Sequence, residues 1–350
     1  MQPGAKMMLT NQENKNISKH SDVRKTISKQ DQTLVERYQN QIQDGTLLFY
    51  KNKELKSLNF LRFLNVNTLV FQFCWNIIPN LQSQSIKELT LILCDISSLN
   101  DFLLDNLEVL KLEGNTKQQQ LKTVIKEIVR FQKLRELEII RIKVDISSLS
   151  QIIGLTKLRL EMCELRSITV LRQLINLEEL SLCKNKYFVD IASLQFLTKL
   201  SALYLCDCYL VSLDALRPLS NLQDLIVSQN QIVYLQPLLG LRQLTELSVS
   251  NNMIVDIETI QQNHNFEDFD FRCQEQPTQE QLQTANIMRD IQTAVTILQM
   301  IHVQSKQIKK QSLIFKKKID ESLPKQFQDH SQFITKVVSL LNICQSDISQ

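Results

Sequence analysis

"LSALYLCDCYLVSLDALRPLSN" (200–221), "LQDLIVSQNQIVYLQPLLGLRQ" (222–243) and "LTELSVSNNMIVDIETIQQNHN" (244–265) follow one another without a gap in this chain of 350 residues. The three stretches have the same length and share the pattern L-x-x-L-x-L-x-x-N/C-x-I/L-x-x-L/I, with Val replacing Leu at some apolar positions. A repeat of constant length indicates a solenoid, in which each copy buries its apolar side chains against the next copy.

Further copies of this pattern surround the three, so that about eleven copies span residues 44–276. The copies start at Asp44, Val66, Ile86, Leu107, Leu134, Leu155, Leu177, Leu200, Leu222, Leu244 and Phe266. Apolar and polar residues alternate around each L-x-L, which predicts a short strand with one buried face. Because the copies recur at a nearly fixed spacing, the strands must be parallel. The segments between them are too short for long helices and favour 3₁₀ turns.

The pattern resembles that of the leucine-rich repeat family, in the short 22-residue class found in phosphatase-regulatory subunits and internalins. The resemblance implies an α/β fold: a leucine-rich-repeat solenoid with a curved parallel sheet, a convex side of short 3₁₀ or helical turns, and here a C-terminal α-helical tail. In overall character the chain is also similar to a Gln/Asn-rich group of leucine-rich repeat proteins that is expanded in some protists.

The chain is expected to divide into four parts. Residues 1–30 are polar and predicted to be disordered. Residues 31–45 are predicted to form a capping helix that ends at Gly45 and covers the first repeat. The solenoid follows over 44–276, with a helical insertion near 117–132 where one repeat is longer. Residues 277–350 are predicted to form a helical, coiled-coil-like tail.

The tail carries apolar residues at a 4-3 spacing from Ile287 to Ile319, and Pro324 ends this pattern. It can fold back as a hairpin or pair with another chain, and we favour the hairpin because Ser305 and Ser312 weaken the seam. The stretch 305–318 has six lysines and no acidic residue. We interpret it as a solvated face rather than a contact with nucleic acid or a membrane.

The ninth position of each copy is expected to be structural. In the family that the repeat resembles, the side chain at this position hydrogen-bonds backbone groups where the chain bends inward, and Cys is a weaker substitute for Asn. Gln274 fills this position in the last copy, and Ile142 departs from the pattern, which puts local order at Ile142 in doubt. The remaining positions hold Asn52, Cys74, Cys94, Asn115, Cys163, Asn185, Cys208, Asn230 and Asn252.

Cys183 and Cys206 occupy a different position, the seventh of two successive copies, and are expected to point out of the sheet as neighbours. Their predicted separation permits a disulfide. However, the N-terminus shows no secretory leader, which favours a cytoplasmic location and two reduced thiols. No histidine is predicted nearby, so we expect no metal site, and no motif points to a cofactor.

The outward positions of the strands form the candidate partner-binding site on the concave face. Tyr204 and Ile226 are predicted to form an apolar island together with Cys183 and Cys206, with Ile140 further along the sheet. Acidic residues surround this island: Glu179, Asp224 and Glu246. An exposed aromatic ring inside a charged rim is typical of the centre of a protein interface.

These observations predict a non-catalytic scaffold that binds a protein partner of basic or mixed charge and takes no small-molecule substrate. The net charge of +3 is too small to indicate nucleic acid by itself, and no stretch is apolar enough to span a membrane. The alternatives are a regulatory subunit or adaptor of a phosphatase, GTPase or ubiquitin ligase, and a ubiquitin ligase that uses Cys344. The chain contains no phosphate-binding glycine loop or nucleophile elbow.

Overall fold

The computed structural model describes residues 28–51, 58–74, 81–94, 98–114, 124–188, 190–261, 266–283 and 285–287. The chain forms two compact units, which divide after Glu138. The predicted heptad seam beyond Ile287, the lysine-rich stretch 305–318 and Cys344 lie outside the described residues, as do residues 1–27 of the predicted disordered segment.

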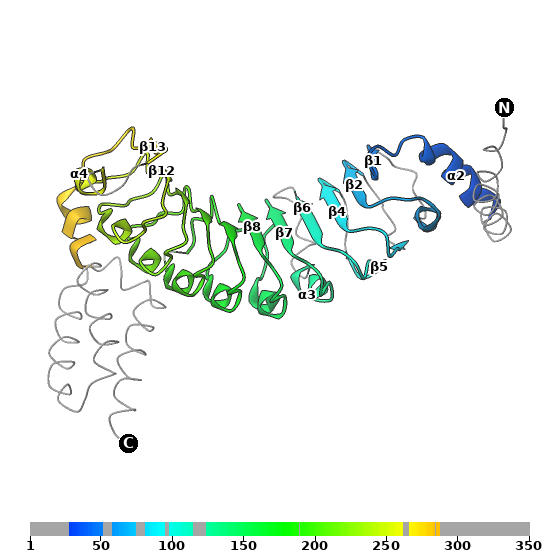
Figure 1. Ribbon diagram of the computed structural model, residues 1–350, viewed down its shortest axis with the longest axis horizontal. Coiled ribbons are helices and arrows are strands. Elements are labelled where there is room, and N and C mark those ends of the chain that lie inside the picture. Colours follow the sequence, from blue (N-terminus) through cyan, green and yellow to red (C-terminus); the bar gives the residue numbers. More distant parts are fainter. Residues whose placement is uncertain are drawn as a thin grey trace, which may run out of the picture. The chain divides into compact units, whose positions relative to one another are not determined.

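The main sheet has eleven parallel strands in sequence order. The five strands nearest the N-terminus are β1 (Thr46–Tyr50), β2 (Thr68–Gln72), β4 (Glu88–Ile92), β6 (Val109–Glu113) and β7 (Glu136–Ile140). The next six are β8 (Lys157–Glu161), β9 (Glu179–Ser181), β10 (Ala202–Tyr204), β11 (Asp224–Ile226), β12 (Glu246–Ser248) and β13 (Asp268–Asp270). Figure 1 shows that the strands of each unit point the same way.

The repeat pattern explains the register of these strands. Leu203 of β10 pairs with Leu180 of β9 and Leu225 of β11, so equivalent positions of successive copies lie side by side. All three leucines are fully buried, whereas four of the six residues next to them in sequence are partly exposed. In ten copies the residue before the ninth position has a left-handed backbone, for example Asp207 with φ of 54°. The chain therefore bends at the same position of each of these copies.

In the first unit, α2 (Lys29–Gln39) begins at Ser28, whose hydroxyl accepts a hydrogen bond from the backbone N–H of Asp31. Tyr38 is buried and stacks on Phe60 with ring centroids 5.4 Å apart. The predicted range of 31–45 is wrong at both ends, because Asn40 is the C-cap. Gly45 instead joins the sheet, where its carbonyl accepts from Asn67 and Thr68.

Short elements return the chain between the strands of the first unit. They comprise the 3₁₀ helix Asn59–Phe63, a small two-stranded sheet of β3 (Leu81–Gln82) and β5 (Phe102–Leu103), and α3 (Val124–Ile128). Within the insertion predicted near 117–132, the structure describes the part from residue 124 onward, and there Ile125, Ile128 and Phe131 are buried.

In the second unit, 3₁₀ helices connect successive strands and lie on the side of the repeats opposite the sheet (Figure 1). They are Ser147–Gln151, Thr169–Gln173, Ala192–Phe196, Asp214–Leu216 and Gln236–Leu238, and the short helix α4 (Ile257–Gln261) follows in the next copy. Each contributes a fully buried leucine or isoleucine, such as Leu194 and Ile260, to the core.

A helical segment begins at residue 279. Thr278 and Gln281 form a reciprocal capping pair: the Thr278 hydroxyl accepts from the Gln281 N–H, and the Gln281 side chain accepts from the Thr278 N–H. Leu282 and Ala285 pack on Val233 and Met253. The start of the segment predicted as a separate tail therefore contacts the repeats.

The predicted leucine-rich-repeat solenoid with 3₁₀ turns between parallel strands is confirmed. Among the described residues, no helix has the length and apolarity needed to cross a membrane.

Candidate partner-binding face

The asparagines at the ninth position fix the bend after each strand in the second unit. The Oδ1 atom of Asn230 accepts from the backbone N–H groups of Cys208 and Leu210 in the preceding copy, both at 3.0 Å. Its Nδ2 donates to the carbonyls of Leu205 and Val227 at 2.8 Å. Asn185 makes the equivalent bonds. Each amide thus joins successive copies and satisfies buried backbone groups.

The cysteines at this position donate but accept little. The Cys208 thiol donates to the carbonyls of Leu182 and Cys206, at 3.2 and 3.3 Å. Cys74, Cys94 and Cys163 donate in the same way. Burial raises the pKa of the Cys94 and Cys163 thiols to about 12 and that of Cys208 to about 11.

At three other ninth positions the structure describes no side-chain hydrogen bond: two of the residues are not described, and the third is apolar. Asn52 and Asn115 lie outside the described residues. The doubt about order at Ile142 is wrong, because its side chain is buried and Arg141 before it keeps the left-handed turn. An apolar side chain replaces the hydrogen-bonded one there.

The strand face, defined here as the outward side chains of β8–β13 and of the two residues that follow each strand, carries the predicted site. Tyr204 lies beside Ile226 in the strand register, and both are partly exposed. On the other side of Tyr204 is Ser181 of β9. The aromatic ring is therefore next to one small polar and one apolar neighbour.

Carboxylates lie beside this pair. Asp224, Glu246 and Asp268 occupy equivalent positions on β11, β12 and β13. Among the described residues, these three carboxylates form no hydrogen bond or ion pair, whereas Glu179 pairs with Lys157 at 2.7 Å. The acidic rim is thus concentrated on β11–β13, and Glu179 contributes less negative charge than its position in the sequence predicted.

The acidic rim acts on Tyr204. Burial raises the pKa of its hydroxyl, and the nearby carboxylates raise it further. These carboxylates are Asp224, Glu179 and Glu246, in decreasing order of effect, while Lys157 opposes them. The hydroxyl stays protonated at neutral pH and can donate a hydrogen bond to a partner.

Some predicted outward residues are less exposed than expected. Cys183 is 6% exposed and Ala202 is 8% exposed. Ile140 lies on β7, two strands from β9, and the Arg159–Glu161 ion pair of β8 stands between it and the island. The structure therefore does not bring Ile140 together with Tyr204.

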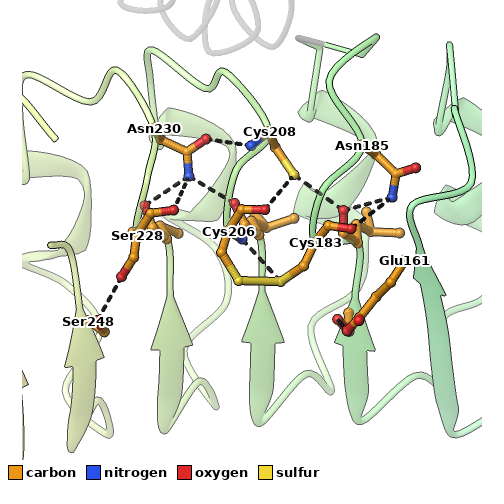
Figure 2. Close-up of a disulfide and its surroundings, with 12 residues drawn as sticks. Glu161, Cys183, Asn185, Cys206, Cys208, Ser228, Asn230 and Ser248 are labelled. Atoms are coloured by element: carbon orange, nitrogen blue, oxygen red, sulfur yellow. Dashed lines mark hydrogen bonds between the residues drawn. A yellow bond between two sulfur atoms is a disulfide. The ribbon is translucent and has the colours of Figure 1, made fainter. Parts of the chain in front are cut away.

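The expectation of two reduced thiols at Cys183 and Cys206 is wrong. The two residues form a disulfide between the ends of β9 and β10, with a Cα–Cα distance of 4.6 Å (Figure 2). Adjacent parallel strands are close enough for this bond, and the equivalent positions of the two cysteines direct both sulfurs to the same side of the sheet. The prediction of reduced thiols relied on the inferred reducing environment rather than on this geometry.

A network of hydroxyl groups on the strand face was missed. Ser228 bonds Ser248 at 2.7 Å and Ser250 at 3.1 Å, and Ser248 donates to Asp270. The signal was available, because these serines recur at outward positions of successive copies, yet single serines carry little information about contacts. The network holds the polar side of the strand face in one arrangement beside Ile226.

No group of three or more His, Cys, Asp or Glu side chains placed to hold a metal occurs in the part of the chain that the structure describes.

Comparison with known proteins finds similarity at the level of solved structures. No family model and no curated protein matches the chain. An internalin, InlF from Listeria monocytogenes, is 18% identical over 68% of this chain and 83% of its own, with a TM-score of 0.47. Internalin C2 from the same organism is 24% identical over 55% and 81%, with a TM-score of 0.45. The functional domain of InlJ from L. monocytogenes, which includes a cysteine ladder, is 21% identical over 68% and 46%, with a TM-score of 0.45.

Proposed function

We propose that the chain is a non-catalytic scaffold that binds a protein partner on the strand face of its second unit. The observation that carries the proposal is the pair of Tyr204 and Ile226, which are partly exposed next to three carboxylates on β11–β13 that make no ion pair within the described part of the chain. An aromatic anchor with an adjacent apolar side chain and a charged rim is the usual composition of an interface centre.

The charges indicate the kind of partner. Asp224, Glu246 and Asp268 on neighbouring strands form no ion pair among the described residues and favour a basic or mixed-charge protein surface, whose lysine or arginine side chains would pair with them. The same carboxylates oppose the phosphates of a nucleic acid, so the strand face is not proposed as a nucleic-acid site. A regulatory or adaptor role toward a phosphatase, GTPase or ubiquitin ligase would use this same face.

The cellular location and the relationship to other proteins are proposed from the sequence. The location is proposed to be the cytoplasm, although the Cys183–Cys206 disulfide is less common in a strongly reducing compartment. Relationship to the Gln/Asn-rich protist group rests on composition.

The proposal is tested by affinity capture from a native extract, with the full chain as bait and mass spectrometry as the readout. Tyr204→Ala and Tyr187→Ala are matched baits, since Tyr187 is an exposed tyrosine that does not belong to the strand face. A partner of this face is captured by the wild type and by Tyr187→Ala, and is lost with Tyr204→Ala. Equal capture by all three baits, with equal melting temperatures, would contradict the proposal.

A further inference from the structure

We propose that the Cys183–Cys206 disulfide is a thiol–disulfide exchange site for small thiols of the glutathione class, at which the thiol bonds to Cys206 and Cys183 leaves. This inference does not depend on the proposed partner. It follows from the different surroundings of the two sulfur atoms.

Access differs between the two cysteines. Cys206 is partly exposed, whereas Cys183 is 6% exposed. A thiolate attacks a disulfide in line with the S–S bond, from the side opposite the leaving sulfur, so the residue beyond each cysteine controls its approach. Along this row of the strand face the order is Glu161, Cys183, Cys206 and Ser228, as Figure 2 shows.

On the side of Cys183 that faces away from Cys206, the next residue in the row is Glu161, which has a longer side chain than Ser228 (Figure 2). Glu161 is fixed by a hydrogen bond from Ser181 at 2.5 Å and by two from Arg159, at 2.7 and 3.2 Å, and the Arg159 guanidinium balances part of its charge. A thiolate that approaches Cys183 from this side meets the larger, fixed side chain. The approach to Cys206 passes Ser228, a small neutral residue whose hydroxyl points toward Ser248 (Figure 2).

The hydrogen bonding also favours Cys183 over Cys206 as the leaving group. The backbone N–H of Cys206 donates to Sγ of Cys183 at 3.2 Å. This bond strengthens as negative charge develops on Cys183, because a donor binds an anion better than a neutral sulfur. Departure of Cys183 as a thiolate is therefore stabilised by a group that is already in place.

Cys208, the nearest other cysteine in sequence to Cys206, is poorly suited to complete the exchange. Its buried thiol donates to the carbonyls of Leu182 and Cys206, and burial raises its pKa to about 11. It is a thiol rather than a thiolate at neutral pH and is a weak nucleophile. A second molecule of the small thiol therefore resolves the mixed disulfide.

The electrons balance in two steps. A thiolate forms a bond to Cys206 Sγ, the S–S bond breaks, and Cys183 takes the electron pair and then a proton from water. A second thiolate attacks the sulfur of the bound thiol and releases Cys206, so that two thiols are oxidised to one small disulfide. Re-oxidation runs the same steps in reverse, with a small disulfide such as glutathione disulfide as the oxidant.

The test maps the mixed disulfide in the full wild-type chain. The protein is first purified under acid and alkylated without reduction, to measure the starting disulfide by mass spectrometry. It is then exposed briefly to reduced glutathione, quenched with acid, alkylated and digested. Tandem fragmentation at Asp207 separates Cys206 from Cys208. We expect glutathione on Cys206 at least tenfold more often than on Cys183, with the alkyl group on Cys183.

A pair of variants tests the direction of approach. Ser228→Glu places a carboxylate on the open side of Cys206, and Ser228→Gln has the same size without the charge; both remove the same hydroxyl. Exchange with glutathione should be several-fold slower in Ser228→Glu than in Ser228→Gln. With 2-mercaptoethanol, which has no carboxylate, the difference should shrink.

Either of two results would overturn the proposal. The first is glutathione on Cys183 as often as on Cys206. The second is a wild-type chain that holds Cys183 and Cys206 as free thiols after purification. Equal rates of the two Ser228 variants with glutathione would overturn the assigned direction of attack.

Discussion

For single residues, the side chain at the ninth position of each repeat decides how many backbone N–H and C=O groups at the bend find hydrogen-bond partners. Asn at the ninth position both donates to two copies and accepts from the backbone of the preceding one, as at Asn230. Cys208 donates to two carbonyls but offers only a weakly accepting sulfur. Because of this difference in acceptor strength, we expect Asn to stabilise this position more than Cys does.

Cys208→Asn should therefore keep or raise stability, by about 0.5–1 kcal/mol, because the amide oxygen can accept backbone N–H groups of the copy before it. Cys208→Asp should lower stability, since the site would bury a carboxylate among carbonyl groups. Thermal and urea unfolding of the three proteins measure this. A Cys208→Asn protein that melts well below the wild type would show that the role assigned to the ninth position is wrong.

The thiol of Cys208 also predicts a dependence on alkaline pH. Its pKa rises from 9.0 to about 11 on folding, because burial disfavours the thiolate. Above pH 9 the unfolded chain releases this proton, whereas the folded chain keeps it. The free energy of unfolding therefore falls progressively as the pH rises from 9 to about 11. Urea unfolding at pH 8 and pH 10 should show a smaller loss for Cys208→Asn than for the wild type. Equal losses would mean that the folded thiol ionises normally.

At the scale of elements, the first helix protects the start of the core. Tyr38 of α2 stacks on Phe60 and meets Phe49 edge-on at 5.1 Å. Tyr38→Ala should cost about 3 kcal/mol, since it leaves a cavity among aromatic rings. Tyr38→Phe keeps the ring and is the matched control, with a smaller loss. If both substitutions are equally harmless in urea unfolding, α2 does not cover the first repeat.

The C-terminal boundary is tested by truncation. Ending the chain after Gln276 removes Leu282 and Ala285, which pack on Val233 and Met253. It also removes Asn286, whose side chain accepts from the Tyr234 hydroxyl at 2.9 Å. We expect circular dichroism to retain the strand signal, because the repeats hold their own core, while the melting temperature falls by several degrees. An unchanged melting temperature would place the boundary before these contacts.

At the scale of the whole molecule, the repeats were predictable and the contacts between outward side chains were not. Each copy specifies its own strand and turn through positions such as Leu203 and Leu225, so the register follows directly from the sequence. The Lys157–Glu179 ion pair and the low exposure of Cys183 depend on how side chains on neighbouring strands pack. The Cys183–Cys206 bond was geometrically possible from the repeat register, and the inferred reducing environment led to the wrong prediction. A linear pattern orders these residues in rows but does not describe how they pack.

The strand face around Tyr204 is proposed to bind a protein partner. The most direct test is the affinity of the captured partner for three proteins by calorimetry: the wild type, Tyr204→Ala and Tyr187→Ala. Loss of an aromatic anchor at an interface centre costs about 2 kcal/mol or more, which corresponds to a roughly 30-fold weaker affinity. We predict this loss for Tyr204→Ala, less than about a threefold change for Tyr187→Ala, and weaker wild-type binding at higher salt. Equal affinity of all three folded proteins would show that the partner binds a different surface, and would contradict the account.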